Sequence, residues 1–219
     1  MRYIRKGVEP ETLSSWKAEA NADWHPTWDG LQKPQKPALH RALLVEQGYV
    51  CCYCEARIDE TESHIEHLRA RSRREDLELE YTNLLASCHG ETENPPPKLR
   101  HCGDKKKGWY EEVLEERFVS PLDPQCVQMF RYAGNGQIMP AKDPVIAVKA
   151  SFTIKLLSLD IPKLDRARKG AIDGALFGLE DLSDEEIRKL VNGFGKRDED
   201  NRYKPFVTSI IYVLSQLLG

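Results

Sequence analysis

The chain has 219 residues, of which 40% are hydrophobic and 31% are charged, and its formal net charge at pH 7 is -3. This length suits one large domain or two small ones. The slight excess of acidic residues excludes a globally basic nucleic-acid binder. A nucleic-acid partner would therefore have to be held by a local basic patch or through a second protein.

Neither end of the chain predicts contact with a membrane. The N-terminal residues lack the apolar stretch of a signal peptide. The longest apolar segment, residues 206–219, is too short to span a bilayer and predicts a buried helix instead. We therefore expect a cytoplasmic protein, in which six cysteines serve as metal ligands rather than forming disulfides.

Two helices are predicted in the first fifty residues. Apolar side chains recur at helical spacing in residues 8–22, and residues 38–47 predict a short amphipathic helix that ends at Gly48. Residues 23–37 between them hold three prolines and two tryptophans and predict an ordered loop. Trp24 and Trp28 in this loop predict either a docking element for a partner or packing over the core.

The second half of the chain is predicted to be mostly helical. Residues 91–100 contain three consecutive prolines and predict an irregular, exposed excursion, and residues 108–118 predict a helix. Asn135-Gly136 between apolar-rich flanks predicts a hairpin over residues 129–139. The pattern is helical from residue 144 onward, with a capping box at residues 183–186.

The cysteine spacing predicts a zinc site. Cys51 and Cys54 form a C-x-x-C knuckle, a spacing that lets two thiolates bind one tetrahedral zinc ion. Such a site needs a second pair, and Cys88 and Cys102 are the nearest downstream cysteines. The sequence therefore predicts a structural zinc with four cysteine ligands.

Two alternatives to this ligand set remain open. His89 or His101 could replace one of the cysteines, or the thiols could be buried and metal-free, behaving as small apolar side chains. Cys52 and Cys126 are predicted to be core thiols.

A His-Ile-Glu-His run ten residues after the knuckle is a second group of side chains that can bind metal or transfer protons. His64, Glu66 and His67 would be costly to bury without a purpose, although a solvated polar segment is an alternative. A zinc deaminase is disfavoured because its H-x-E is followed by P-C-x-x-C, which is absent here. The H-E-x-x-H motif of metalloproteases is also absent.

Four short motifs occur in a fixed order between residues 49 and 108: CCYCE, HIEH, YTNLLASC and HCGDKK. This ordered set resembles the zinc-binding variants of the HNH nuclease family, whose fold is the ββα-metal unit. The resemblance implies an α+β protein with a zinc-stapled ββα-metal core over residues 38–120. A helical N-terminal segment would occupy residues 1–37, and a hairpin plus helices would occupy residues 121–219.

The resemblance also implies roles for individual residues. His67 would be the general base that activates water, Glu66 a ligand to a catalytic divalent ion, and Asn83 a hydrogen-bonding support for the His67 segment. The family usually has an Asn or His metal ligand directly after the last cysteine, where this chain has Gly103. Asp104 is the expected substitute, and His64 and His101 are alternatives.

The chemistry of these residues agrees with phosphodiester hydrolysis. A neutral imidazole can accept a proton from water near neutral pH. Hard ions such as Mg²⁺ or Mn²⁺ prefer oxygen ligands, and the thiolates would keep zinc apart from them. Two basic runs flank the predicted site and predict phosphate contacts, with an ordinary solvated surface as the alternative: Arg69, Arg71, Arg73, Arg74, Lys105, Lys106 and Lys107.

Most of the chain is similar to a narrower group, the HNH subunits (PtuB) of Septu anti-phage systems, including versions encoded beside retrons. This similarity implies an effector nuclease controlled by an ATPase subunit of the PtuA type. Its complex would include the retron RNA-DNA and reverse transcriptase. The substrate would be DNA or an RNA such as tRNA. A non-catalytic zinc-stapled module that binds nucleic acid or protein is the competing prediction.

Overall fold

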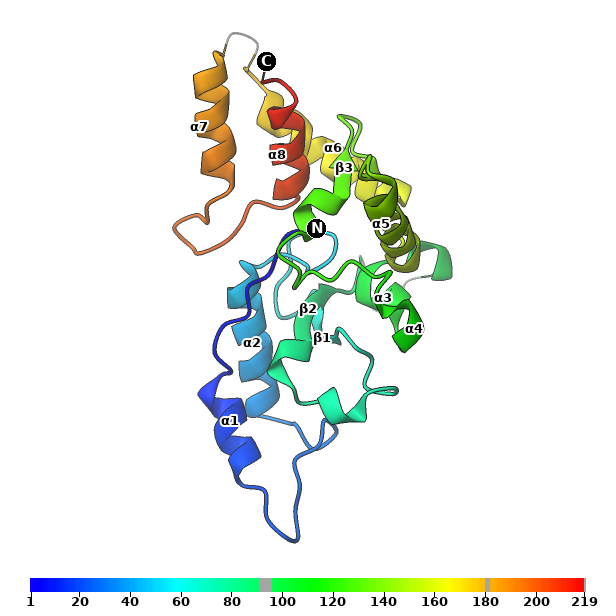
Figure 1. Cartoon of the computed structure of the whole chain (residues 1–219). Coiled ribbons are helices and arrows are strands. Elements are labelled where there is room, and N and C mark those ends of the chain that lie inside the picture. The colour runs from blue at the N-terminus through cyan, green and yellow to red at the C-terminus, as the bar shows by residue number, and fades with distance from the viewer. Residues whose placement is uncertain (91–95, 180–181, 219) are drawn as a thin grey trace.

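The computed structural model describes residues 1–90, 96–179 and 182–218, and it is a mixed α+β fold (Figure 1). A small ββα unit lies at the centre. Its strands are β1 (Ser63–His67) and β2 (Leu84–Cys88), and its helix is α3 (Cys102–Lys106). The first two helices lie at one end of the molecule and the last two at the other (Figure 1).

The remaining elements flank this unit. Short 3-10 turns occur at Glu75–Leu77, Tyr81–Asn83, Pro97–Leu99 and Cys126–Met129. The other helices and strands are α1 (Glu11–Ala18), α2 (Gln35–Gln47), α4 (Glu112–Glu115), β3 (Phe130–Tyr132), β4 (Ile138–Pro140), α5 (Pro144–Leu157), α6 (Pro162–Leu176), α7 (Asp184–Phe194) and α8 (Val207–Ser215).

The two central strands pair in antiparallel register, with Ser63 opposite Cys88 and His67 opposite Leu84. Every residue of β2 is buried, because α2 and α3 both contact this strand. In β1 only Ser63 and Glu66 are buried, whereas His64, Ile65 and His67 are partly exposed. The site residues of β1 are thus held against a fully buried neighbour.

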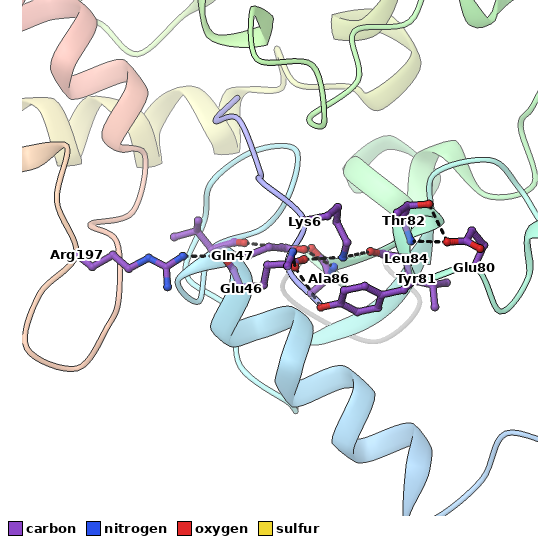
Figure 2. A network of polar contacts seen from close by, with 11 residues as sticks. Lys6, Glu46, Gln47, Glu80, Tyr81, Thr82, Leu84, Ala86 and Arg197 are labelled. Carbon is purple, nitrogen blue, oxygen red and sulfur yellow. Dashed lines mark hydrogen bonds and ion pairs between the residues drawn. The ribbon is translucent and has the colours of Figure 1, made fainter. Parts of the chain in front are cut away.

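A side chain rather than a third strand satisfies the backbone of Ala86 (Figure 2). Gln47, the last residue of α2, accepts a hydrogen bond from the Ala86 N–H at 2.7 Å and donates one to the Ala86 carbonyl at 2.8 Å. The neighbouring Glu46 binds Lys6 at 2.5 Å, and Lys6 also donates to the Leu84 carbonyl. These contacts fasten α2 and the N-terminal segment to β2.

The predicted helices form with changed limits. The first is shorter than residues 8–22, and the second ends at Gly48, whose φ of 63° is the left-handed conformation that favours glycine. Within residues 108–118 only α4 is helical. Trp109 packs instead against Phe118 and Phe152, and these aromatic contacts replace a regular helical stripe.

The predictions for the C-terminal half agree with the structure. Strands β3 and β4 form the hairpin, with Gly136 at a φ of 85° in the turn. Ser183 and Glu186 exchange the two hydrogen bonds of a capping box at the start of α7. Residues 91–95 of the predicted excursion lie outside the described residues, and Pro97–Leu99 form a 3-10 turn.

One large hydrophobic cluster runs from the N-terminal segment through the ββα unit to β3, β4 and α5, and a smaller cluster joins α6 to α8. The large cluster contains residues from both sides of positions 37 and 120, the boundaries predicted from the sequence. The division of the chain into three parts remains a prediction. In the part of the chain that the structure describes, no helix has the length and apolar character needed to cross a membrane.

Candidate functional site

Four cysteines meet at one end of the ββα unit. Cys51 and Cys54 come from the knuckle, Cys88 ends β2, and Cys102 begins α3. All four are buried, and their sulfur atoms lie within 4.8 Å of one another. The cluster therefore joins three segments that are far apart in the sequence.

The knuckle folds tightly enough to turn backbone amides toward these sulfurs. The Cys51 N–H donates to the Ala56 carbonyl at 2.9 Å, and Glu55 turns the chain with a φ of 65°. The Ala56 N–H then points to Cys54 Sγ at 3.5 Å, and the Cys88 N–H points to Cys51 Sγ at 3.4 Å. Amides in these positions stabilise thiolates.

The donor set fits a structural zinc ion. Zinc binds thiolate sulfur at about 2.3 Å, which places two tetrahedral sulfur ligands about 3.8 Å apart. Cys54 Sγ and Cys88 Sγ are 3.8 Å apart. Hydrogen bonding, chiefly from Cys102, lowers the pKa of Cys54 to about 7, which favours the thiolate that zinc requires.

His101 lies beside this cluster as a neighbour of the four cysteines. Its Nδ1 is 3.2 Å from Cys102 Sγ and 3.7 Å from Cys88 Sγ. An Nδ1–H in this position donates to the sulfurs, a common arrangement around bound zinc. Because the four cysteines already complete a tetrahedral set, His101 is not needed as a ligand. Cys52 and Cys126 are buried, as expected of core thiols.

Glu66 is a buried carboxylate in the middle of the ββα unit, only 6% exposed. Its Oε1 accepts a hydrogen bond from Tyr53 at 3.0 Å and lies 2.7 Å from Lys106 Nζ. Its Oε2 faces His64 Nε2 at 3.6 Å, beyond hydrogen-bond range. Burial opposes ionisation, but Lys106 and His64 outweigh it and hold the pKa of Glu66 below its usual value.

His67 lies at the end of β1, and its ring is fixed on two sides. Its Nε2 lies 3.0 Å from the Glu78 carbonyl oxygen, so Nε2–H donates there and Nδ1 is left as an acceptor. The ring of Trp28 packs edge-on against it at a centroid distance of 4.3 Å. Burial lowers the pKa of His67, which keeps the imidazole neutral at pH 7.

Asn83 spans the chain that follows His67. Its Oδ1 accepts from the Arg69 N–H at 2.8 Å, and its Nδ2 donates to the carbonyls of Arg69 and Leu77 at 3.0 and 3.1 Å. The Asn83 side chain is 2% exposed and makes three backbone hydrogen bonds. It therefore fixes the loop on the C-terminal side of His67.

A second group of ligand-type side chains lies next to Glu66. His64, His89 and Asp104 have ligand atoms within 4.8 Å of one another. The Nδ1 atoms of His64 and His89 are 3.2 Å apart. Burial lowers the pKa of His64, but the interaction with the negatively charged Glu66 and the charge of Asp104 outweigh it, and the net shift is upward.

Gly103 lies between these groups. Its N–H donates to Ser87 Oγ at 3.0 Å. A Cβ atom at this position would lie 2.7 Å from His64 Nε2 and 2.8 Å from Glu66 Oε2, closer than real Cβ contacts. Gly103 is therefore required by the two side chains of β1 that approach it.

Comparison with known proteins identifies relatives among retron and Septu proteins, although no family profile matches the chain. A protein of retron Vc95 from Vibrio cholerae serotype O1 biovar El Tor, assigned as an HNH endonuclease, is 30% identical over 174 residues. The match covers 77% of this chain and 78% of the relative. A protein of retron Ec83 from Escherichia coli, with the same assignment, is 31% identical over 205 residues, with the same shares covered.

The chain belongs to the family of retron HNH endonucleases. The Septu protein PtuB of Bacillus thuringiensis is a more distant relative, 25% identical over 149 residues, which cover 66% of this chain and 52% of PtuB. The predicted resemblance to HNH proteins of retron and Septu systems is thus confirmed. The predicted α+β class is confirmed as well, with a four-cysteine cluster that fits a zinc site.

The residues predicted to contact phosphate differ in whether an acidic side chain already pairs with them. Arg69 pairs with Glu115, Arg71 with Asp29 at 2.9 Å, and Arg74 with Asp76 at 2.7 Å. The side chains of Arg73, Lys105 and Lys107 are exposed. A groove of about 550 Å³ includes Glu78, whose carbonyl holds the His67 ring. Its lining residues are Thr27, Asp29, Arg71, Ser72, Arg73, Glu75 and Glu78.

Lys106 departs from the expected row of three phosphate-binding lysines. Its side chain is fully buried and pairs with Glu66, and its Nζ also donates to the His67 carbonyl at 2.8 Å. Successive helical residues point about 100° apart, so Lys106, the last residue of α3, turns inward while Lys105 stays outside. Lys107 follows the end of the helix and is exposed. Lys106 therefore belongs to the interior of the HNH unit.

The sequence patterns did not assign site roles to several neighbours of this HNH unit. Trp28, 8% exposed, lies against His67 and not on an open docking surface, whereas Trp24 is 37% exposed and contacts Trp16 edge-on. Tyr53 binds Glu66, and its position inside the C-x-x-C motif was the only available signal. His89 was predicted only as a possible replacement for a zinc-binding cysteine, whereas the structure places it beside His64 and Asp104.

Proposed function

We propose that this protein is a metal-dependent HNH endonuclease that hydrolyses phosphodiester bonds in nucleic acid. The observation that carries this proposal is the pairing of His67 and Glu66 at the end of one strand. One is a neutral imidazole with Nδ1 left as an acceptor, and the other is an ionised, buried carboxylate. These are the two groups that water activation and cation binding require.

His67 acts as the general base. The Glu78 carbonyl holds Nε2–H, so a water molecule at Nδ1 can transfer its proton to the ring. Trp28 and the three hydrogen bonds of Asn83 restrict movement of the ring and of the loop behind it. Restricting the base in this way lowers the entropic cost of reaching the transition state.

Glu66 holds the catalytic divalent ion through Oε2. A bound Mg²⁺ or Mn²⁺ supplies charge stabilisation for the phosphate oxygens and the leaving group. Lys106 and Tyr53 fix the other oxygen, and Lys106 keeps the carboxylate ionised. Asp104 and His64 lie close enough to this region to be considered as further ligands.

The exposed basic residues Arg73, Lys105 and Lys107 contact phosphates of the substrate. Arg69, Arg71 and Arg74 can join them by exchanging their present acidic partners for phosphate. Such local contacts allow an acidic protein to hold nucleic acid. The substrate is DNA or tRNA. Both carry the phosphate backbone that these residues would contact, and phosphate contacts do not discriminate between bases.

The protein acts as the effector of an anti-phage defence complex. Two relatives belong to retrons and a third is a Septu protein, which supports a role within such a system. An ATPase subunit of the PtuA type restrains the nuclease, and the retron RNA-DNA and reverse transcriptase join it through the complex. A controlling partner agrees with the danger that an unrestrained nuclease poses to its own cell.

The test is a cleavage assay on DNA and tRNA with the zinc-loaded chain and with the complex purified from its operon. We expect His67→Ala to reduce cleavage by about 100-fold or more, because a general base contributes roughly that factor. Zinc content and circular dichroism should stay unchanged. The matched control is His25→Ala, since His25 is an exposed histidine in the N-terminal loop.

The same experiment tests the competing assignment. A zinc-stapled binding module would bind nucleic acid or protein tightly and cleave neither DNA nor tRNA with Mg²⁺ or Mn²⁺, alone or within the complex. Wild-type cleavage rates in His67→Ala would exclude the proposed mechanism.

A further inference from the structure

Two potential ligand atoms of β1 lie next to each other beside Gly103. Glu66 Oε2 and His64 Nε2 face each other there at 3.6 Å, too far apart for a hydrogen bond. Two ligands that are each about 2.1 Å from one ion lie roughly 3 to 3.6 Å apart. The 3.6 Å separation thus fits two ligands of one shared metal ion.

The neighbouring contacts direct Glu66 Oε2 and His64 Nε2 toward each other. Tyr53 and Lys106 occupy Oε1 of Glu66 and leave Oε2 directed toward His64. The two side chains share one face of β1, because they are two residues apart on a strand. Their exposures differ: the Glu66 side chain is 7% exposed and that of His64 is 26% exposed. An ion can therefore enter from the His64 side.

The second nitrogen of His64 is already held. Its Nδ1 lies 3.2 Å from Nδ1 of His89, and one of these two nitrogens donates to the other. With His64 as the donor, its Nε2 keeps a lone pair for the ion. Histidine ligands of metals commonly donate the other ring N–H to a neighbouring acceptor, which fixes the tautomer and the ring orientation. A His89 that accepts this hydrogen bond orients the His64 ring for the ion.

Gly103 completes the argument, because a side chain there would fill the same space. A Cβ at this position would lie 2.7 Å from His64 Nε2 and 2.8 Å from Glu66 Oε2. A side chain on residue 103 and the His64 imidazole would therefore compete for the same space.

We propose that His64 is the second protein ligand of the catalytic ion, next to Glu66, and that the glycine at position 103 makes room for the His64 ring. This inference rests on the proposed function, since the ion is the one that the nuclease uses. Two protein ligands leave further coordination positions for water and a phosphate oxygen. One imidazole in the set favours Mn²⁺ and other transition metals over Mg²⁺.

The test measures Mn²⁺ binding to the zinc-loaded full chain by electron paramagnetic resonance, where the signal of free Mn²⁺ disappears on binding. We expect one Mn²⁺ per chain beyond the zinc, and a loss of affinity of about tenfold or more in both His64→Ala and Gly103→Ala. His25→Ala should bind as the wild type does. Asp104→Asn should change affinity by less than His64→Ala, because Asp104 lies outside the proposed Glu66–His64 ligand pair.

A ligand exchange sharpens the test. In His64→Ala/Gly103→His the His64 ring that would clash with a side chain at position 103 is gone. The new imidazole then comes from α3 instead of β1. We expect this double variant to regain Mn²⁺ affinity relative to His64→Ala, whereas Gly103→His alone should bind poorly because two imidazoles compete for one space. Zinc content and circular dichroism confirm that each variant is folded.

Three outcomes would overturn the inference: no Mn²⁺ binding to the wild type, His64→Ala within about twofold of wild-type affinity, or a larger loss in Asp104→Asn than in His64→Ala. The readout is independent of cleavage. A chain that binds Mn²⁺ through His64 but cuts no nucleic acid refutes the nuclease. One that cuts while His64→Ala retains full Mn²⁺ affinity refutes only the ligand assignment.

Discussion

The ammonium nitrogen of Lys106 lies 2.7 Å from Oε1 of Glu66, inside the protein, where the Lys106 side chain is fully buried and that of Glu66 is 7% exposed. The same nitrogen donates to the His67 carbonyl. One lysine thus contacts both residues of the Glu66-His67 pair, and it stabilises the charged form of the carboxylate.

Replacing Lys106 should therefore destabilise the fold. In Lys106→Met the buried Glu66 loses its charge partner, and breaking a buried pair by removing one member costs about 3–5 kcal/mol. The measurement is the free energy of unfolding in urea. Lys105→Met is the matched control, because Lys105 is exposed and an exposed substitution changes stability by about 0.5 kcal/mol or less. Equal stability of the two variants would contradict the assigned role of Lys106.

Removing one zinc ligand should abolish zinc binding. Cys88→Ser takes away one of the four sulfurs that tie the knuckle to β2 and α3. We expect purified protein to hold far less than one zinc ion per chain and to lose its cooperative unfolding transition. Metal analysis and calorimetry measure the two effects. Cys52→Ala is the control, since Cys52 lies outside the cluster, and its zinc content should match that of the wild type.

The hydrogen bonds between Gln47 and Ala86 should contribute measurably to stability. Gln47→Met keeps the length of the side chain but leaves the buried Ala86 N–H without its acceptor, at a cost of about 1–3 kcal/mol. Faster hydrogen exchange of the Ala86 amide would report the loss directly. Gln216→Met, at an exposed position, should change neither quantity. Unaltered exchange at Ala86 would show that this side chain does not support β2.

Stability should depend on the protonation of His40. Its ring lies 2.9 Å from Ser63 Oγ, and burial lowers its pKa, with His64 and His89 adding to this effect and Glu60 opposing it. The unfolded state therefore binds the proton first as the pH falls below about 6.5, and unfolding becomes easier until the pH drops below the pKa of the folded state.

The comparison is with His40→Gln, which cannot take up that proton. Chemical unfolding between pH 8 and pH 5 should show the wild type losing stability relative to the variant on the acidic side. A constant difference between the two proteins across this range would exclude the effect of His40.

Several features of this protein could be predicted from short stretches of sequence because their causes are local. A glycine that permits a left-handed turn ends α2, Asn135-Gly136 forms a hairpin turn, and Ser183 and Glu186 cap α7. The zinc cluster was also predictable, since two cysteines three residues apart need a further pair and few cysteines were available.

Other features depended on contacts between distant segments. The sequence predicted three equivalent lysines after Cys102, and only the packing of α3 against β2 decided that Lys106 turns inward. The predicted helix over residues 108–118 is reduced to α4, because aromatic side chains around Trp109 pack together instead. Local patterns carry no information about which neighbour a side chain will meet.

The sequence by itself determined which reactive groups this protein has: four thiols that can bind zinc, a carboxylate and an imidazole on adjacent residues, and an asparagine further along the chain. Tertiary structure alone decided the orientation of these groups. It placed Trp28 against His67, and it brought His64 to the space above Gly103. The reason is physical, since residue types fix which bonds can form, and only the packing of remote segments fixes the distances.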